Sequence, residues 1–387
     1  MPIIKQLFLS TVFGTCLLNS HAQDKPAERA RDLGIAFEGK TGKNNAITDV
    51  PGIEVGYKTL ISGSGKLEYG KGPVRTGVTV ILPKGKTGDS YPAAWFSLNG
   101  DGEMTGLPYI EDYGRGSGPI GITNTNSVGA VRDAIGEWTF KHFSKGEFVD
   151  FSFGLPVVAE TWDGMLNDIN GFHVKKEHVW DALDSAAGGK IMEGNIGGGT
   201  GMACYGFKGG SGTASRVFKI DSVEYTLGVF VQANFGGRRE LMITGVPVGK
   251  EIKDLNPVLN EVKRKDGSII VIVATNAPLL PGDLKLVAKR VTHGIARTGT
   301  ISHDGSGEIF LALSTATPLT NEKGTLDTWQ VIPKSFLDPV FKATVEATEE
   351  AIINALLAAE DMDGINGNKW FGIPHQRLKE IMKKYGR

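Results

Sequence analysis

The chain has 387 residues, of which 53 are glycine, about twice the usual share of ~7% in globular proteins. Apolar residues make up 40% and charged residues 22%, and glycine shows no period of three, so the composition excludes collagen-like and wholly disordered chains. The 42 basic and 43 acidic residues leave a formal net charge of -1. No strong field attracts nucleic acid or an anionic membrane, and we expect a small, nearly neutral substrate.

The first 22 residues have the pattern of a cleaved secretory signal. One cation, Lys5, precedes an apolar stretch over residues 7–18, and Ser20 and Ala22 are small residues where a signal peptidase cuts. The stretch is too short to span a bilayer, and a buried N-terminal strand is the alternative. Removal of this segment leaves Cys204 as the only cysteine, so no intrachain disulfide can form. We therefore expect a periplasmic or secreted protein without a membrane partner.

Residues 23–387 contain no linker, which predicts a single domain. Short runs rich in β-branched residues predict buried strands over 78–82, 157–159, 225–231, 269–274 and 309–313. Apolar residues at helical spacing predict a helix over 283–297 and a second, later one in which Phe341, Val345, Ile352 and Leu356 form the inner stripe. Strands and helices mixed in one long unit predict a layered α/β or α+β architecture.

The densest glycine cluster, residues 194–201, does not have the spacing of a nucleotide-binding loop. Lys208 precedes its glycines instead of following them, and the dinucleotide fingerprint fails at its third glycine. The cluster therefore predicts backbone that packs closely. The histidines lack the spacing of a zinc motif, so no metal or cofactor is expected. The polar loop around His303 favours a solvated turn histidine over a catalytic one.

One serine stands where a self-cleaving precursor places its nucleophile. The charged loop 260–267 ends at Gly267, and Ser268 opens the apolar strand that follows. The Ser268 hydroxyl could attack the Gly267 carbonyl, and hydrolysis of the resulting ester would release an N-terminal serine. Its α-amine, with an ordinary pKa of ~7.7–8.0, could then act as the base for its own hydroxyl. An ordinary Asp-Gly-Ser turn is the alternative.

The chain resembles a family of self-processing serine hydrolases, the L-aminopeptidase/D-esterase (D-amidase) enzymes and the β-peptidyl aminopeptidases. The resemblance covers nearly the whole mature chain and is carried by residues 31–34, 45–52, 75–79, 157–161, 194–201, 231–234, 268–278, 296–299, 302–310 and 371–375. It implies an α+β, N-terminal-nucleophile-like fold built as a four-layer αββα sandwich. It also implies cleavage into an α chain, 23–267, and a β chain, 268–387, that remain associated, and a homotetramer of such units.

The resemblance also implies the catalytic residues. Ser268 matches the nucleophile, Ser306 and Glu308 match its supporting serine and glutamate, and Asn234 matches the oxyanion-hole residue. A neutral amide suits that task because it donates a hydrogen bond without having to be ionised. From residue types alone, a self-bonded turn at Ser306 and a structural asparagine at a strand end remain alternatives.

Three further residues are expected to bind substrate. Glu160 matches the acid that receives the substrate's amino group, because an ammonium in a partly dry cleft needs a carboxylate partner. Trp162 departs from the tyrosine or aliphatic residue of other family members, and its indole can donate only one hydrogen bond. Phe151 is either another wall of the same pocket or an ordinary core aromatic.

The function implied is hydrolysis of the amide or ester bond after a free N-terminal residue of a small peptide, amide or ester. Small L-amino acids, D-alanine derivatives and β-amino acids all remain possible substrates. One alternative is a related self-cleaving N-acyltransferase, which usually has a threonine nucleophile. The other is an uncleaved extracytoplasmic binding protein for amines or peptides.

Overall fold

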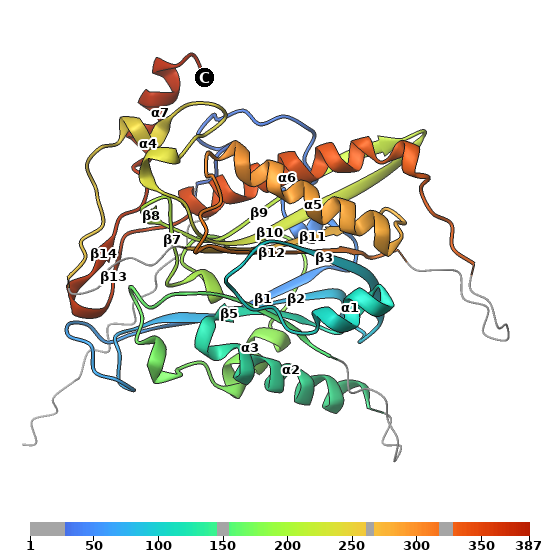
Figure 1. The fold of residues 1–387 in the computed structure, drawn as a ribbon, viewed down its shortest axis with the longest axis horizontal. Helices are drawn as coiled ribbons and strands as arrows, with labels where there is room; N and C mark the ends of the chain where they lie inside the picture. Colours follow the sequence, from blue (N-terminus) through green and yellow to red (C-terminus); the bar gives the residue numbers. More distant parts are fainter. Residues whose placement is uncertain (1–27, 145–154, 261–266, 317–327) are drawn as a thin grey trace, which may run out of the picture.

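Two β-sheets lie face to face and carry helices on their outer faces (Figure 1). The computed structural model describes residues 28–144, 155–260, 267–316 and 328–387, so the predicted signal segment 1–22 and Phe151 lie outside the described residues. The four-stranded sheet has the order β1 (Glu54–Ser62), β2 (Val74–Lys86), β5 (Ile120–Asn124) and β6 (Val157–Thr161). The six-stranded sheet has the order β4 (Arg115–Ser117), β3 (Ser90–Gly100), β12 (Gly307–Ser314), β11 (Ser268–Thr275), β10 (Val223–Asn234) and β9 (Gly210–Ile220).

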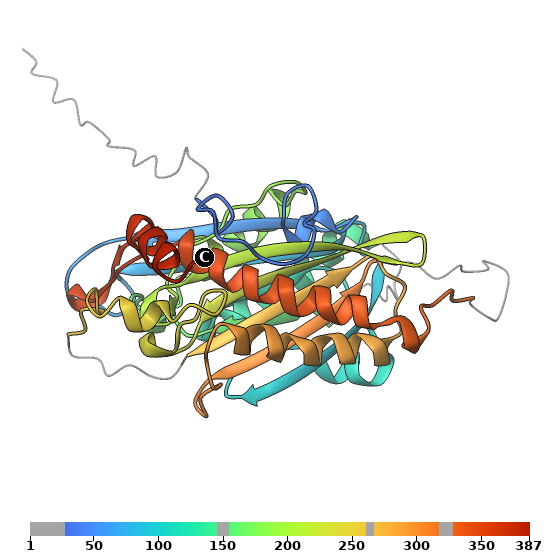
Figure 2. The ribbon, with the colours of Figure 1, turned by 90° about the horizontal axis from the view of Figure 1, so that it is seen from above.

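Two pairs of helices form the outer layers. Helices α5 (Pro281–Arg297) and α6 (Asp338–Leu357) lie side by side across the six-stranded sheet (Figure 2). Helices α2 (Val128–Phe143) and α3 (Lys176–Asp184) cover the four-stranded sheet. This arrangement confirms the predicted α+β, four-layer αββα fold.

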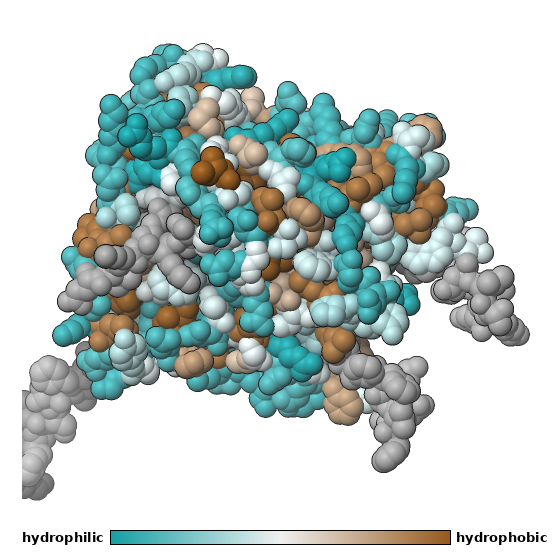
Figure 3. All heavy atoms as spheres, in the orientation of Figure 1, coloured by the Kyte–Doolittle hydropathy of each residue, from teal (hydrophilic) through white to brown (hydrophobic). Residues whose placement is uncertain are grey.

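The other α-helices and strands are short. They are α1 (Leu107–Tyr113), α4 (Val248–Glu251) and α7 (His375–Lys384), with the small hairpins β7 (Ala203–Cys204) with β8 (Phe207–Lys208) and β13 (Met362–Asp363) with β14 (Lys369–Trp370). None of the described helices combines the length and the apolar character that crossing a membrane requires. The face of the molecule in Figure 3 carries apolar side chains in small groups between polar ones.

Alternation along the strands builds the cores. On β11, Ile270 and Ile272 pack between the two sheets, whereas Ile269 and Val271 pack against the helices. Because successive side chains of a strand point to opposite faces, Ser268 lies on the face that looks toward the second sheet. The continuous apolar run of β11 therefore reflects a central strand that is buried on both faces.

The predicted strands and helices are confirmed, but the inner face of α6 differs from the predicted stripe. Ile352 and Leu356 are buried, while Phe341 and Val345 are only half-buried. Small residues, including Ala351, line much of the buried face, because α6 lies close against β9. The predicted stripe therefore identified part of the contact face and missed the small residues that share it.

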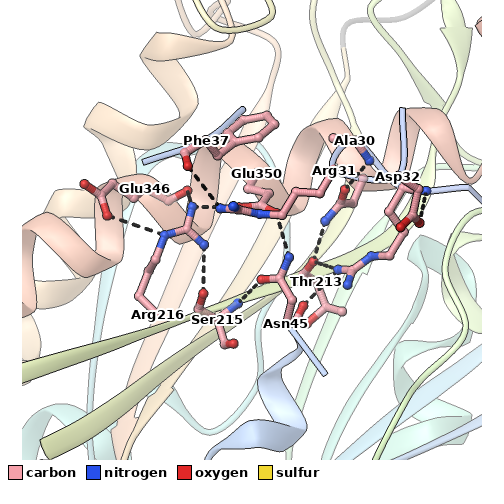
Figure 4. A network of polar contacts seen from close by, with 12 residues as sticks. Ala30, Arg31, Asp32, Phe37, Asn45, Thr213, Ser215, Arg216, Glu346 and Glu350 are labelled. Carbon is pink, nitrogen blue, oxygen red and sulfur yellow. Dashed lines mark hydrogen bonds and ion pairs between the residues drawn. The ribbon is translucent and has the colours of Figure 1, made fainter. Parts of the chain in front are cut away.

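A buried ionic network joins α6 to the N-terminal half of the chain (Figure 4). The Glu350 carboxylate accepts hydrogen bonds from Arg31 Nε at 2.7 Å, Arg216 at 2.7 Å and Asn45 at 2.6 Å. The carboxylate of Glu346 lies 3.4 Å from Arg216 Nε. These arginine partners hold the pKa of Glu350 below its ordinary value against the opposing effect of burial. The network spans residues on both sides of position 268, so it ties the two halves of the fold together.

Candidate active site

Ser268 is the first residue of the central strand β11. It lies directly opposite Asn234 of antiparallel β10 and beside Gly307 of parallel β12. Ser268, Asn234 and Ser306 are all buried, with 4%, 7% and 3% of their surfaces exposed. Residues that are opposite each other in a sheet point to the same face, so Ser268 and Asn234 share the face toward the second sheet.

Two glycines allow the backbone around Ser268 to pack closely. A Cβ at Gly267 would lie 1.9 Å from the Asn234 carbonyl oxygen and 2.6 Å from Phe235 Cα. A Cβ at Gly307 would lie 2.2 Å from the Asp101 carbonyl oxygen. The Gly307 N–H donates a hydrogen bond to the Gly267 carbonyl oxygen at 3.2 Å. The carbonyl that Ser268 would attack is thus already polarised by a backbone donor.

Asn234 is held at both ends of its amide. Its Oδ1 accepts a hydrogen bond from the Ala203 N–H at 2.8 Å, and its Nδ2 donates to the Trp162 carbonyl at 2.9 Å. An amide nitrogen carries two hydrogens, so the second N–H remains for another acceptor. These two contacts orient a neutral donor beside Ser268, as an oxyanion site requires.

Ser306 and Glu308 flank Gly307, the neighbour of Ser268 in the sheet. The Ser306 hydroxyl donates to Glu308 Oε1 at 3.2 Å, and the Ser306 N–H donates to the His303 carbonyl at 2.9 Å. Glu308 is fully buried, and this burial raises the pKa of its carboxyl, opposed by the hydroxyls of Ser302 and Ser306 and by His303. The pair therefore forms a polar group at the mouth of β11.

Glu160 reaches the same region from the four-stranded sheet. Its Oε1 accepts the Glu103 N–H at 3.0 Å, and its Oε2 accepts the Thr125 hydroxyl. A Cβ at Gly102 would lie 3.3 Å from Glu160 Oε1 and 3.4 Å from Gly307 Cα, so only a glycine separates the Glu160 carboxylate from the neighbour of Ser268. Burial raises the pKa of Glu160, opposed by its two hydrogen-bond donors. A substrate ammonium would offset this cost of burial.

Trp162 directly follows the last residue of β6. Its carbonyl accepts the Asn234 amide, while its half-buried side chain packs with Met165, Ala203 and Trp370. The structure therefore places the predicted residues around the start of β11: Glu160, Trp162, Asn234, Gly267, Ser268 and Ser306. Glu308 pairs with Ile269, so it lies on the side of the six-stranded sheet that faces the helices, opposite to the face of Ser268. Phe151 lies outside the described residues.

Sequence reasoning missed the residues that hold this constellation in place. They are the Gly307 N–H, Thr125, Ala203 and the side chain of Asn99, which donates to the carbonyls of Ser302 and His303 at 3.2 and 3.0 Å. All act across strand pairs or between sheets, and no local motif marks them. Only glycines next to polar residues, as in Gly305-Ser306-Gly307-Glu308, hinted at close backbone packing.

The other predicted features have structural partners. A Cβ at Gly198, in the glycine cluster, would lie 2.1 Å from Gln232 Oε1 and 2.6 Å from the Ile122 carbonyl oxygen. The cluster thus packs between the sheets. The His303 ring bonds Glu240 at 2.8 Å. Within the described residues, no three His, Cys, Asp or Glu side chains converge as a metal site would require.

The chain matches a family model and is similar to known proteins over most of its length. Residues 45–370 match peptidase family S58. The chain is 49% identical to β-peptidyl aminopeptidase BapA of Sphingosinicella microcystinivorans over 98% of both chains. Its structure is similar to that of L-aminopeptidase D-Ala-esterase/amidase from Ochrobactrum anthropi, with a TM-score of 0.85 and 44% identity over 94% of this chain and 99% of that one. A Burkholderia sp. β-aminopeptidase aligns with a TM-score of 0.83 and 42% identity over 93% and 99% of the two chains.

Proposed function

Because this chain belongs to peptidase family S58 and is an aminopeptidase, a hydrolase, we propose that Ser268 both cleaves the precursor and serves as the nucleophile of the mature enzyme. The observation that carries the proposal is the sheet register, which sets Ser268 beside Asn234 on one side and Gly307 on the other. A nucleophile, a neutral donor and a polarised carbonyl therefore meet at one strand end.

Self-cleavage would begin with attack of Ser268 Oγ on the Gly267 carbonyl carbon. Negative charge then develops on the Gly267 oxygen, to which the Gly307 N–H already donates a hydrogen bond. The C–N bond breaks, the departing nitrogen takes up the proton lost by the hydroxyl, and an ester joins Gly267 to Ser268. Water hydrolyses the ester and leaves a carboxylate on Gly267 and a free α-amine on Ser268.

In the mature enzyme the same hydroxyl would attack the substrate. The α-amine of Ser268 accepts the hydroxyl proton and passes it to the leaving group, while Asn234 donates to the oxyanion. The resulting ester on Ser268 is hydrolysed by water. Ser306, oriented by Glu308, supports the α-amine and hydroxyl from its position just before the neighbouring strand β12.

Glu160 would make the enzyme an aminopeptidase by pairing with the ammonium of the N-terminal residue. Its carboxylate lies next to Gly102 and Gly307, close to the nucleophile, so a bound ammonium and the scissile carbonyl are separated by only a short stretch of substrate. Relatives include enzymes named for β-peptides and one named for L-amino acids and D-alanine esters. We propose a substrate with a small N-terminal residue. We favour β-amino acids because the chain is 49% identical to BapA and 44% identical to the L-aminopeptidase D-Ala-esterase/amidase.

A panel of p-nitroanilides tests this specificity. We expect hydrolysis of the β-alanine, L-alanine or D-alanine derivative, with β-alanine the fastest, and no hydrolysis of N-acetylated forms. Hydrolysis of the acetylated forms at equal rates would contradict the role of Glu160. Addition of an amine acceptor distinguishes an acyltransferase, which would form a new amide. A folded protein without hydrolysis or reaction with a serine-directed probe would instead support the binding-protein alternative.

We also propose that the protein is exported to the periplasm or secreted and assembles as a homotetramer of processed units. Export is supported by the composition of residues 1–22, and the assembly by the family resemblance. Fractionation of cells and the mass of the native particle in solution test these two statements.

A further inference from the structure

We propose that Asp163 is a positioning residue for this reaction, an inference that rests on the function proposed above. Its carboxylate holds the end of β6 in the shape that places Glu160 and the Trp162 carbonyl, and through that carbonyl Asn234, around Ser268. Asp163 follows Trp162 directly and is only 1% exposed. It touches neither the nucleophile nor the predicted path of the substrate ammonium, so its effect must pass through its neighbours.

The Asp163 carboxylate collects donors from three separate segments. Asn124 Nδ2, at the end of β5, donates to Oδ2 at 3.1 Å, and Asn167 Nδ2 donates to Oδ1 at 3.0 Å. The Thr76 hydroxyl on β2 and the backbone N–H of Asp163 itself also donate to the carboxylate. A buried carboxylate that is surrounded by donors is well satisfied only while it is ionised.

Two adjacent contacts couple this cluster to the site. β5 and β6 run parallel to their ends, where Asn124 pairs with Thr161. Beyond that point Asn124 binds Asp163, and the next residue, Thr125, binds Glu160. Movement of Asp163 away from Asn124 would therefore disturb the ammonium-binding carboxylate. It would also shift the Trp162 carbonyl that orients the Asn234 amide.

Protonation of Asp163 would break this arrangement. A carboxylic acid carries an O–H donor of its own, which would face the donors of Thr76, Asn124 and Asn167. Burial raises the pKa of Asp163 to about 6, opposed by these hydrogen bonds. We therefore expect an acid limb in kcat near this pH, separate from the limb of the Ser268 α-amine, whose ordinary pKa is ~7.7–8.0.

In the part of the chain that the structure describes, charged groups near Asp163 lie on β8, on β2 and in its own turn. Lys208 on β8 is the cation whose charge interacts with this carboxylate, and burial lowers the pKa of Lys208 to about 7. Arg75 precedes Thr76 on β2, but its guanidinium donates to the carbonyls of Ser62, Gly63, Val74 and Asp363. Asp168, in the same turn, binds His173 and the Gly70 N–H. Among the described residues, Thr76, Asn124, Asn167 and the Asp163 N–H thus make the direct contacts of the carboxylate, and Lys208 acts on it through its charge.

The test is the pH dependence of kcat and KM for Asp163→Asn, Thr76→Val and Asp168→Asn, measured on processed enzyme with β-alanine p-nitroanilide. Asp163→Asn is neutral at every pH, so we expect kcat to fall about 10- to 100-fold near pH 8, as for a misplaced catalytic group, and the lower acid limb to disappear. Thr76→Val removes one donor to the ionised carboxylate and should move that limb to higher pH. Asp168→Asn changes an equally buried aspartate of the same turn and should leave the limb in place.

A properly folded Asp163→Asn enzyme with an unshifted acid limb would overturn the inference. If Asp163→Asn does not fold, an unshifted limb in Thr76→Val overturns it instead. Wild-type protein that is processed but hydrolyses no amide would refute the proposed function, and this inference with it. If the wild-type protein hydrolyses the amide and the acid limb is unchanged in both Asp163→Asn and Thr76→Val, the role of Asp163 is refuted while the proposed function stands.

Discussion

Removal of the Asn234 amide separates the contribution of this residue to catalysis from its contribution to structure. Asn234→Ala deletes the proposed oxyanion donor and also the contacts with Ala203 and Trp162. Asn234→Asp keeps an oxygen that can accept from the Ala203 N–H but loses the donor. If Asn234 stabilises the oxyanion, both substitutions should lower kcat strongly. Asn234→Asp also sets a buried carboxylate oxygen against the Trp162 carbonyl, so it should lose stability as well.

The expected magnitudes follow from these contacts. Loss of one oxyanion donor costs about 2.7–4 kcal/mol in the transition state, which is ~100- to 1000-fold in kcat. The buried Ala203 N–H and Trp162 carbonyl, left without partners in Asn234→Ala, cost about 1–3 kcal/mol each in the free energy of unfolding. Gln232→Ala is the matched control, because Gln232 lies two residues earlier on the same face and donates to the Thr123 carbonyl and the Thr161 hydroxyl.

The assay measures kcat, KM and the midpoint of urea unfolding for wild type and the three variants. Because the proposed self-cleavage would use the same chemistry, the processed fraction is determined first and rates are expressed per processed chain. We expect Gln232→Ala to lose stability comparably to Asn234→Ala while keeping kcat within a few-fold of wild type. Processed Asn234→Ala with a kcat close to that of Gln232→Ala would refute the oxyanion role.

Three further predictions follow from buried charges. Glu160→Gln keeps one acceptor oxygen, which can bind the Glu103 N–H, and its amide nitrogen can donate to the Thr125 hydroxyl, but the charge is lost. The kcat/KM for free amines should therefore fall ~10- to 150-fold for a loss of about 1.5–3 kcal/mol, and an unchanged kcat/KM would exclude ammonium binding there. Glu350→Ala leaves Arg216 buried without its partner at 2.7 Å and should lower the free energy of unfolding by about 3–5 kcal/mol. The two processed chains should then separate at a lower urea concentration, as measured by size-exclusion chromatography. The exposed pair Lys40–Glu224 is its control, because Glu224→Ala should cost less than ~1 kcal/mol. Burial lowers the pKa of Lys208 to about 7, so above this pH the unfolded chain binds more protons than the folded one. The free energy of unfolding should therefore rise with pH by up to about 1.4 kcal/mol per unit between ~7 and ~10, and Lys208→Met should abolish this rise; an unchanged slope in that variant would assign it to other groups.

Local sequence patterns predicted the buried strands and the long helices, and they offered Ser268 as a candidate nucleophile beside an ordinary turn. The four-layer arrangement was implied by the family resemblance. The run after Ser268 is short, β-branched and apolar throughout, which is typical of a strand buried on both faces, and the structure places it at the centre of the six-stranded sheet. The helices over 281–297 and 338–357 were likewise predictable from their periodicity. The contact face of α6 was only partly predictable, because small side chains that permit close approach carry little hydrophobic signal.

The geometry of the site depends on contacts that no local pattern records. Asn234 and Ser268 are opposite each other only because β10 and β11 pair in one particular register, and a shift by one residue would turn the Asn234 side chain to the other face. Glu160 comes near Ser268 through the close approach of Gly102 to Gly307, across two sheets. Asp163 is held by Thr76 and Asn124, which are far from it in the sequence, and by Asn167, which lies across a turn from it. The family resemblance implied Asn234, Ser268 and Glu160, whereas Asp163 was indicated only by the structure.

The covalent state of the purified protein tests the central claim most directly. Intact mass and N-terminal sequencing of the wild-type protein should reveal two chains, the smaller beginning Ser268-Ile269-Ile270-Val271, whereas Ser268→Ala should remain one uncleaved chain without hydrolytic activity. A wild-type protein that hydrolyses its substrate as a single intact chain would contradict the account, as would cleavage and turnover by Ser268→Ala.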